Sequence, residues 1–282
     1  EITKAMEMVS AAKMRRAVDN ALGTRSYAEL ALELLVNISK ENQVNHPLLS
    51  PNETNKTLAL VIGSNKGLCG SFNANILKSL LNFAKEEKKE IEYITVGKKA
   101  ENSVKKIKGN AIASFIDFSD NLKIDEISGL SKIIIDEFIT GKYNKVVIIY
   151  TNFISSINYV AEIRNLLPIS EKNIKEMIQD LGPGKIEEKD MRIKNMALYL
   201  FEPNEEEILN QVLPRLTEVQ IYQALLESIA SEHSARMMAM RNASDSADEM
   251  IQDLTLSFNQ ARQAGITQEI AEISAGAAAL SN

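Results

Sequence analysis

The sequence predicts an α/β protein with long helices: an antiparallel coiled coil of the N- and C-terminal helices, carrying an inserted Rossmann-like open α/β domain. Three observations lead to this fold class. Both ends of the chain show helical periodicity, and the middle alternates β-branched runs with helical stretches. Aromatic residues make up only 5% of a chain that is 45% hydrophobic, with few Gly and Pro, which favours helices packed on helices.

The N-terminal segment, residues 1–40, is predicted to form one helix. Only Gly23 interrupts it, and apolar side chains recur at steps of three and four. These are Ile2, Met6, Val9 and Ala12, followed later by Tyr27, Leu30, Leu34 and Ile38. Asn42–Asn55, with two Pro and four Asn, is typical of a loop. We therefore expect residues 1–55 to form the N-terminal coiled-coil helix and a linker.

Residues 56–203 are predicted to form the α/β domain. Short β-branched runs indicate buried parallel strands at Thr57–Ile62, Ile91–Val96 and Lys145–Tyr150. Helical stretches follow near Asn73–Lys88, Lys98–Lys108 and Lys123–Thr140, which gives the rhythm of an open α/β sheet. Two later runs, Phe153–Arg164 and Met196–Phe201, are candidates for antiparallel or edge strands. The charged stretch Ser170–Arg192, which contains Gly-Pro-Gly, is predicted to be a mobile loop.

The C-terminal segment, residues 204–282, has the strongest structural signal in the sequence. No Gly occurs from Lys185 through Ala264, and no Pro follows Pro214. Apolar or small residues recur every three or four positions over about six heptads, the pattern of a coiled-coil stripe. They are Leu216, Val219, Tyr222, Leu226, Ile229, His233, Met237, Met240, Ala243, Ala247, Ile251, Leu254, Phe258 and Ala261.

Some 65 helical residues would extend on the order of 100 Å, whereas a domain of this size is a few tens of Å across. The C-terminal helix is therefore expected to protrude. Its apolar stripe needs a partner, and the only other long helix predicted is residues 1–40, paired antiparallel. The C-terminal helix would outrun this partner, which leaves a small, apolar tip, Ala264–Leu280, to be enclosed by something else.

Composition excludes several function classes. The net charge of −6 argues against general nucleic-acid binding, which needs a basic surface. The single cysteine, Cys69, excludes a disulfide framework, and two histidines cannot build a His-rich metal site. No run of 18 apolar residues and no signal peptide is visible. Because helical pattern begins at Glu1, we expect an incomplete N-terminus.

Three segments in the family's order resemble signature segments of the ATP synthase gamma subunit: Ile2–Lys13 (ITKAMEMVSAAK), Gly63–Asn73 (GSNKGLCGSFN) and Ile266–Leu280 (ITQEIAEISAGAAAL). Glu232–Asp245 (EHSARMMAMRNASD) is also similar to that family. The resemblance spans essentially the whole chain, and its C-terminal signature is the most specific. No cysteine-bearing regulatory insertion of the chloroplast type is present.

The resemblance implies a central rotating shaft of an F-type ATP synthase, with no catalytic site, cofactor or metal of its own. It implies that the coiled coil lies inside the hexamer of alpha and beta subunits. The α/β domain would contact the epsilon subunit and the c-subunit ring, with one copy per complex. Localisation would be peripheral, on the cytoplasmic face of a bacterial plasma membrane or, alternatively, on the matrix side of the mitochondrial inner membrane.

The resemblance also implies which residues contact the alpha and beta subunits. Arg262, Gln263 and Thr267 match family positions on the C-terminal helix. Read without the resemblance, Arg262 would be a solvated side chain on a helix face. The guanidinium of Arg262 offers a fork of donors suited to carboxylates.

The N-terminal signature supplies Lys4, Met6 and Lys13, which would lie near the mobile lower ends of the beta subunits. A charged solvent-facing surface is an equally good interpretation of these residues. Glu232 and Arg236 have the spacing of an intrahelical ion pair, worth only about 0.2–0.5 kcal/mol on a surface helix. The resemblance places this pair at an interface low on the shaft.

Other motifs have less specific interpretations. The loop Gly63–Gly70 follows a strand, but its glycine spacing fits neither phosphate-loop pattern, which favours a tight turn over nucleotide binding. Cys69 and His233 are better explained as packed side chains than as a nucleophile and a metal ligand. The alternatives to the shaft are a nucleotide-dependent α/β enzyme that dimerises through its helices and a static coiled-coil scaffold. The Ala-rich tip is either a frayed end or a smooth pivot.

Overall fold

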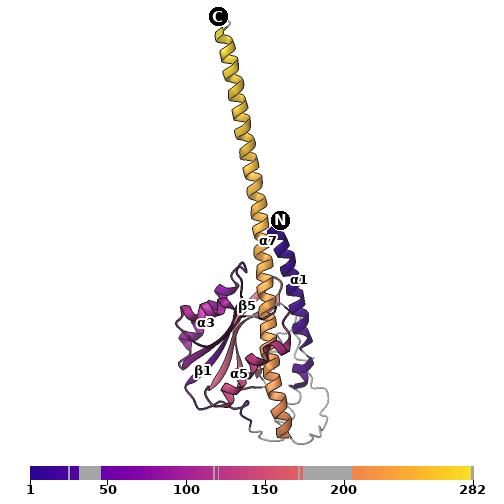
Figure 1. Cartoon of the computed structure of the whole chain (residues 1–282), viewed down its shortest axis with the longest axis vertical. Coiled ribbons are helices and arrows are strands. Elements are labelled where there is room, and N and C mark those ends of the chain that lie inside the picture. Colours follow the sequence, from indigo (N-terminus) through magenta and orange to yellow (C-terminus); the bar gives the residue numbers. More distant parts are fainter. Residues whose placement is uncertain are drawn as a thin grey trace.

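The computed structural model describes residues 1–24, 26–31, 46–116, 118–119, 121–170, 172–173 and 205–280. One long helix forms the long axis, with an α/β domain around its lower half and the C-terminus at the far end (Figure 1). The elements are α1 (Ile2–Gly23), β1 (Lys56–Ile62), α3 (Phe72–Glu86), β2 (Glu90–Val96), α4 (Lys98–Lys106), β3 (Asn110–Phe115), the 3-10 helix η1 (Ile124–Ile127), α5 (Ser128–Ile139), β4 (Lys145–Ser155), β5 (Asn158–Leu167) and α7 (Glu205–Leu280).

The sheet has the strand order β3-β2-β1-β4-β5, and only β5 runs antiparallel. Alternate residues of β1 serve two cores: Leu58 and Leu60 pack with α5 and α7, whereas Ala59 and Val61 pack with α3 and α4. Burial on both faces explains why β1 is a continuous apolar run. The predicted long-helix α/β fold class and its three parallel strands are confirmed.

One strand of the sheet was not predicted from the sequence, and another, the predicted antiparallel or edge strand, was located only approximately. The edge strand β3 (NAIASF) is short and only partly buried, so its sequence carries a weak strand signal. The run Phe153–Arg164 holds the end of β4, a turn and most of β5, an antiparallel edge strand. The predicted strand Met196–Phe201 and almost all of the predicted loop Ser170–Arg192 lie outside the described residues.

Helix α7 is a single helix of 76 residues, about 110 Å long at the usual rise, and it includes Pro214. It is longer than the roughly 65 residues inferred from the apolar stripe. Between Ile221 and Ala230 every side chain except Ile229 is buried. In this part the prediction of a two-helix seam was wrong, because α7 also packs on β4, β5, α5 and α3. Small and apolar residues between the stripe positions allow this burial on all sides.

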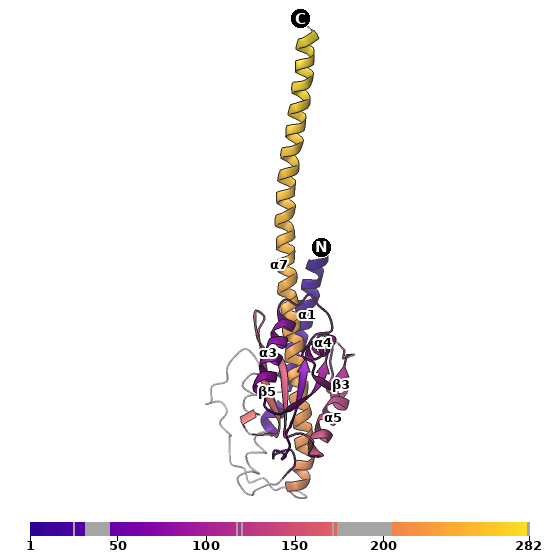
Figure 2. The same ribbon diagram turned by 90° about the vertical axis from the view of Figure 1, so that its left-hand side faces the viewer.

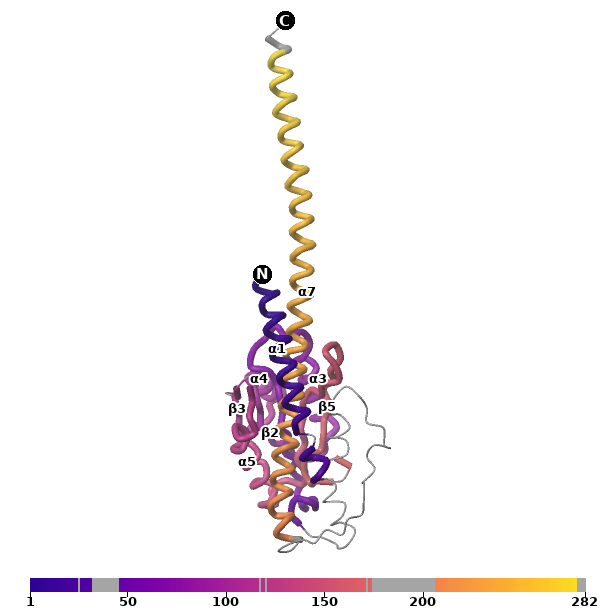
Figure 3. The backbone as a smooth tube through the Cα atoms, turned by 90° about the vertical axis from the view of Figure 1, so that its right-hand side faces the viewer, coloured from indigo at the N-terminus to yellow at the C-terminus, as the bar shows by residue number. Residues whose placement is uncertain are grey.

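Helix α1 packs antiparallel along α7 (Figures 2 and 3). Near the N-terminus, the hydroxyls of Thr3 and Ser244 are 2.6 Å apart, which marks how far up α7 its partner reaches. The prediction of one unbroken helix was wrong, because α1 ends at Gly23 and a second helical stretch covers residues 26–31. Gly23 has a low helix propensity, and the hydroxyl of Thr24 donates to the carbonyl of Ala21 at 2.7 Å.

Replacing Pro214 with alanine is expected to stabilise the chain. A proline inside a helix removes one backbone hydrogen bond and costs about 3 kcal/mol in an exposed helix. Because the surrounding structure already accommodates Pro214, we expect a gain of about 1–2 kcal/mol in the free energy of unfolding. Urea unfolding followed by circular dichroism measures it, with the exposed neighbour Gln211→Ala as control. A loss of stability would show that packing of the proline ring outweighs the missing bond.

A buried carboxylate stands at the start of β2. The side chain of Glu92 is 9% exposed, and its oxygens lie 3.4 Å from Lys56 Nζ and 3.5 Å from Lys142 Nζ. The Tyr143 hydroxyl also donates to it. This hydrogen bond, with help from the lysines, lowers the pKa of Glu92 below its ordinary 4.5. Burial, together with Glu92, raises the pKa of Tyr143 to about 12.

The stability of the chain is expected to fall in acid through Glu92. Its pKa is lower in the folded than in the unfolded state, so its contribution is present above the unfolded value and is lost as pH falls through the folded value. Urea titrations at pH 7, 5 and 3.5 should show this loss, and Glu92→Gln should flatten it while lowering stability at pH 7. Glu53→Gln, an exposed carboxylate, is the control. Equal acid sensitivity in both variants would contradict the assignment.

Candidate functional site

The part of α7 beyond Ser244 has no partner among the described residues (Figure 1). We call residues 245–277 the bare shaft. Except for Asn259, its side chains are exposed, and its large apolar side chains are between 50% and 72% exposed. They are Met250, Ile251, Leu254, Leu256, Phe258, Ile266, Ile270 and Ile273. An exposed apolar surface of this extent marks an interaction site.

Arg262 lies in an apolar ridge of the bare shaft. Residues four apart form a continuous ridge on a helix, and here the ridge is Met250, Leu254, Phe258, Arg262, Ile266 and Ile270. A surface that encloses this ridge must also accept the guanidinium, because burying an unpaired charge is costly. The position of Arg262 therefore calls for a carboxylate or carbonyl partner.

Gln263 and Thr267 lie together beside this ridge. They are four residues apart on one face, both exposed, and the Thr267 hydroxyl donates to the Gln263 carbonyl at 2.9 Å. Because this bond uses the hydroxyl proton, Thr267 presents mainly a methyl group and an acceptor oxygen to a partner. The structure thus groups these two residues and leaves Arg262 on the neighbouring ridge.

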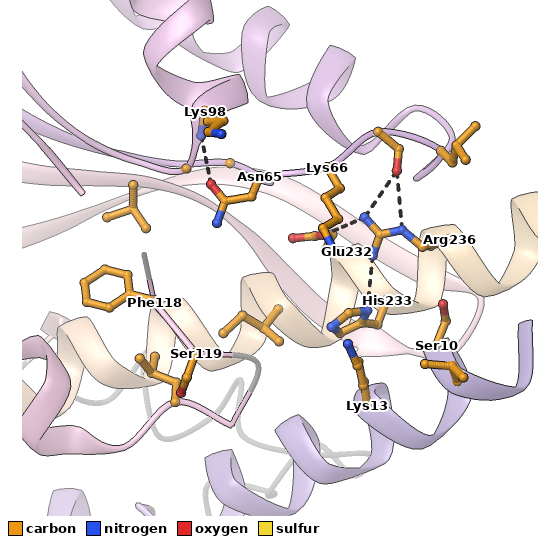
Figure 4. Close-up of a pocket in the computed structure, with 18 of the residues that line it drawn as sticks. Ser10, Lys13, Asn65, Lys66, Lys98, Phe118, Ser119, Glu232, His233 and Arg236 are labelled. Atoms are coloured by element: carbon orange, nitrogen blue, oxygen red, sulfur yellow. Dashed lines mark hydrogen bonds and ion pairs between the residues drawn. The ribbon is translucent and has the colours of Figure 1, made fainter. Parts of the chain in front are cut away.

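The three residues predicted on the N-terminal helix fall on two faces of α1. Met6 and Lys13 are half-buried, two turns apart, and both line a cavity beneath α1 (Figure 4). Lys4 is exposed and lies outside this lining. Only Met6 and Lys13 are therefore brought together.

Arg236 joins the shaft to the α/β domain within this chain. It is 8% exposed, its Nε and Nη2 both donate to the carbonyl of Gly67 at 3.3 Å, and Nη2 is 2.6 Å from Glu232 Oε1 (Figure 4). Its Nη1 lies 3.2 Å from His233 Nδ1. Since arginine can only donate, Nδ1 is the acceptor. The sequence showed the Glu232–Arg236 spacing but not the contact with Gly67, 169 residues away.

Serine side chains of α7 form a second seam, with β4 and with the turn that follows it. The Ser228 hydroxyl accepts from the Thr151 N–H at 3.0 Å, Ser231 donates to the Thr151 carbonyl at 3.4 Å, and Ser234 donates to the carbonyl of Ser156. These residues were not singled out in the sequence. The signal that could have found them is the three-residue spacing of small polar residues beside the apolar stripe. Together the two seams fix the shaft to the sheet.

The loop Gly63–Gly70 packs against the first residues of α3 and α4. Asn73 Oδ1 accepts from the Ser64 N–H at 3.2 Å, and Asn65 Oδ1 accepts from the Lys98 N–H at 3.1 Å. A Cβ at Gly63 would come within 2.8 Å of the Ala100 nitrogen. These contacts occupy the first turn of α4, where a nucleotide phosphate would otherwise bind. They therefore do not support nucleotide binding at this turn.

The described residues contain no group of His, Cys, Asp or Glu side chains arranged to hold a metal ion. No helix among them is long and apolar enough to cross a membrane. Cys69 is buried, and its sulfur accepts from the Asn73 amide at 3.1 Å. It is a packed side chain, as predicted.

Comparison with known proteins identifies the relatives of the chain. The ATP synthase family model (ATP-synt) matches residues 1–280. The ATP synthase gamma chain of Chloroflexus aurantiacus is 41% identical over all of this chain and 94% of that protein. The gamma chain of Stenotrophomonas maltophilia is 37% identical over 99% of this chain and 94% of its own length.

Solved structures agree with these relatives. The central stalk and c-ring structure of Tetrahymena thermophila mitochondrial ATP synthase contains a chain with 26% identity and a TM-score of 0.61, covering 86% of this chain and 100% of that one. A Euglena gracilis mitochondrial ATP synthase structure shares the fold at 20% identity, with a TM-score of 0.62 over 99% of this chain and 89% of its own. The resemblance predicted from the sequence is confirmed. The chain belongs to the ATP synthase family, as a gamma chain, the non-catalytic rotor subunit of the central stalk.

Proposed function

We propose that the bare shaft turns inside a hexamer of alpha and beta subunits and that Arg262, Gln263 and Thr267 contact the catalytic subunits. The observation that carries this proposal is the exposed apolar ridge, which continues for some 25 residues beyond the contact between Thr3 and Ser244 and contains one cation. An apolar sleeve with a carboxylate opposite Arg262 would satisfy both features.

The lower end of the shaft has a different role in this proposal. Lys4 and the exposed parts of Met6 and Lys13 lie near the mobile lower ends of the beta subunits, and the α/β domain rests against the epsilon subunit and the c ring. The sequence suggested Glu232 and Arg236 as subunit contacts. In this proposal they act mainly within the chain, and only the partly exposed Glu232 can also reach a neighbouring subunit. As the relatives include bacterial gamma chains, we place the complex on the cytoplasmic face of a bacterial plasma membrane.

Rotation would act through asymmetry. A single α7 helix presents the ridge containing Arg262 to one side and the Gln263–Thr267 face to another. Turning the shaft therefore offers each catalytic subunit a different contact in sequence. A ligand with different affinity for the conformations of its partner shifts their populations. The shaft is such a ligand, attached at its foot to an ion-driven ring, and so couples rotation to ATP synthesis or hydrolysis.

Reconstitution tests this function. ATP hydrolysis is measured with alpha and beta subunits alone, with this chain added, and with Arg262→Ala or Gln263→Ala chains. We expect the chain alone to hydrolyse nothing, the wild-type chain to restore cooperative turnover, and each substitution to lower it by about tenfold. Lys78→Ala, exposed on α3, is the control. Unchanged turnover on addition of the chain would refute the shaft, and full turnover with both variants would refute the assigned contacts.

A further inference from the structure

A cavity of about 1000 Å³ lies where α1, α7 and the α/β domain meet (Figure 4). Its floor is formed by the loops that follow β1, β2 and β3, at the carboxyl ends of the parallel strands. That edge is where open α/β sheets bind ligands. The volume is at the upper end of the range for small-molecule sites.

The walls are apolar and the polar groups are mainly cationic. Met6 and Val9 of α1, Leu225 and Ile229 of α7, and Phe118 supply apolar surface. The charged lining consists of Lys13, Lys66, Lys98 and Arg236 against one carboxylate, Glu232, which Arg236 binds. Phe118 lies at one side of the cavity, and Lys13 and Lys66 lie at the other (Figure 4). Most of the charged groups, Glu232 and Arg236 included, therefore lie at the end opposite Phe118, whereas Lys98 lies nearer to Phe118 (Figure 4).

The N-terminus of α4 is not available to clamp a phosphate. At the α4 N-terminus the N–H groups of Lys98 and Lys99 bond to Asn65 and Ser64. Gly97, in the left-handed region with φ of +89°, packs so closely on Gly63 that a Cβ would come within 2.3 Å of the Gly63 oxygen. An anion at this end of α4 would therefore be held by the lysine side chains of the lining rather than by the α4 amides. Such a site suits one anionic head with an apolar body better than the pyrophosphate of a nucleotide.

We propose that this cavity binds a single-chain amphiphile with an anionic head, either a fatty carboxylate or a lysophospholipid. The head pairs with Lys66, beside Lys13, and the tail lies along Ile229 toward Phe118. Because the half-buried Met6 and Lys13 belong both to this lining and to the proposed beta-subunit contacts, the bound amphiphile lowers turnover of the assembled enzyme. This second statement rests on the proposed function, whereas binding to the chain does not.

Binding is measured on the full chain with dodecanoate below its micelle concentration. The chain has no tryptophan, so Phe118→Trp gives a single fluorescent reporter in the cavity lining, and calorimetry on the wild-type chain provides a second readout. We expect saturable one-site binding that Lys66→Glu weakens about tenfold and Lys66→Arg preserves. Lys78→Glu, which adds the same charge on α3 away from the cavity, is the matched control. The same titration with lyso-phosphatidylglycerol shows whether the site prefers a lysophospholipid to a fatty carboxylate.

Three results would overturn the site: no saturable binding, equal affinity of wild-type and Lys66→Glu chains, or equal affinity for neutral dodecanol. The last would indicate apolar partition only. The regulatory statement is tested on the reconstituted complex, where dodecanoate should lower ATP turnover less in Lys66→Glu than in Lys78→Glu. Binding to the isolated chain with no effect on a working complex refutes this regulation. If the chain binds dodecanoate but restores no ATP turnover, the proposed shaft function is refuted and the proposed amphiphile site is not.

Discussion

Replacing Leu254 and Phe258 together with aspartate should weaken assembly with the alpha and beta subunits by about 100-fold or more. Both side chains are more than 60% exposed in the isolated chain and lie on the ridge that contains Arg262. Burying each should contribute about 1.5–3 kcal/mol, and tenfold in affinity corresponds to about 1.4 kcal/mol. The aspartates also bring carboxylates into an apolar sleeve. Titration of labelled chain with the hexamer measures the change.

The matched control adds the same charge to the opposite side of the bare shaft. Gln252 and Gln260 are exposed and lie off the ridge, so Gln252→Asp with Gln260→Asp should change affinity far less. Neither double variant should alter urea unfolding of the isolated chain, because residues 245–277 have no packing partner among the described residues. Equal affinities for the two double variants would show that the ridge is not the enclosed face.

The sequence could predict the elements whose patterns are governed by local burial. β1 is buried on both faces and has a continuous apolar run, and the β-branched residues of β2 mark it as a strand although Glu92 interrupts them. The helical stripe of α7 persists over its whole length because one side always meets α1, the sheet or, in the proposed function, the sleeve. The signature segments then led to the family. Hydrophobic periodicity of this strength is the most reliable local signal.

Other features depend on long-range contacts that periodicity does not encode. Ile221–Ala230 has a stripe consistent with a two-helix seam, yet it is buried on nearly all sides by the sheet and α5. The same helix resumes a one-sided pattern beyond Ser244, where nothing described covers it. Glu232 and Arg236 have the same spacing whether exposed or buried. The stability that this ion pair contributes depends on the Gly67 carbonyl, whose position beside Arg236 cannot be predicted from the sequence.

Arg236→Ala should lower the free energy of unfolding by about 3 kcal/mol. The side chain is buried, holds Glu232 at 2.6 Å and donates twice to the Gly67 carbonyl. Removing one partner of a buried ion pair costs about 3–5 kcal/mol because the other charge is left behind. Glu232 is 18% exposed, so water recovers part of that cost. Urea unfolding measures the loss, with Arg241→Ala, exposed on the same helix, as control.

Arg236→Lys tests whether the positive charge alone is enough or whether the shape of the guanidinium is also needed. A lysine can pair with Glu232, but it lacks the planar fork that reaches Gly67 and His233 together. We therefore expect a loss between those of Arg241→Ala and Arg236→Ala, with faster hydrogen exchange in the Gly63–Gly70 loop. If Arg236→Ala and Arg241→Ala unfold alike, the serine seam to Thr151 and Ser156 suffices to hold the shaft. The torque between foot and shaft would then pass through β4 rather than through the loop.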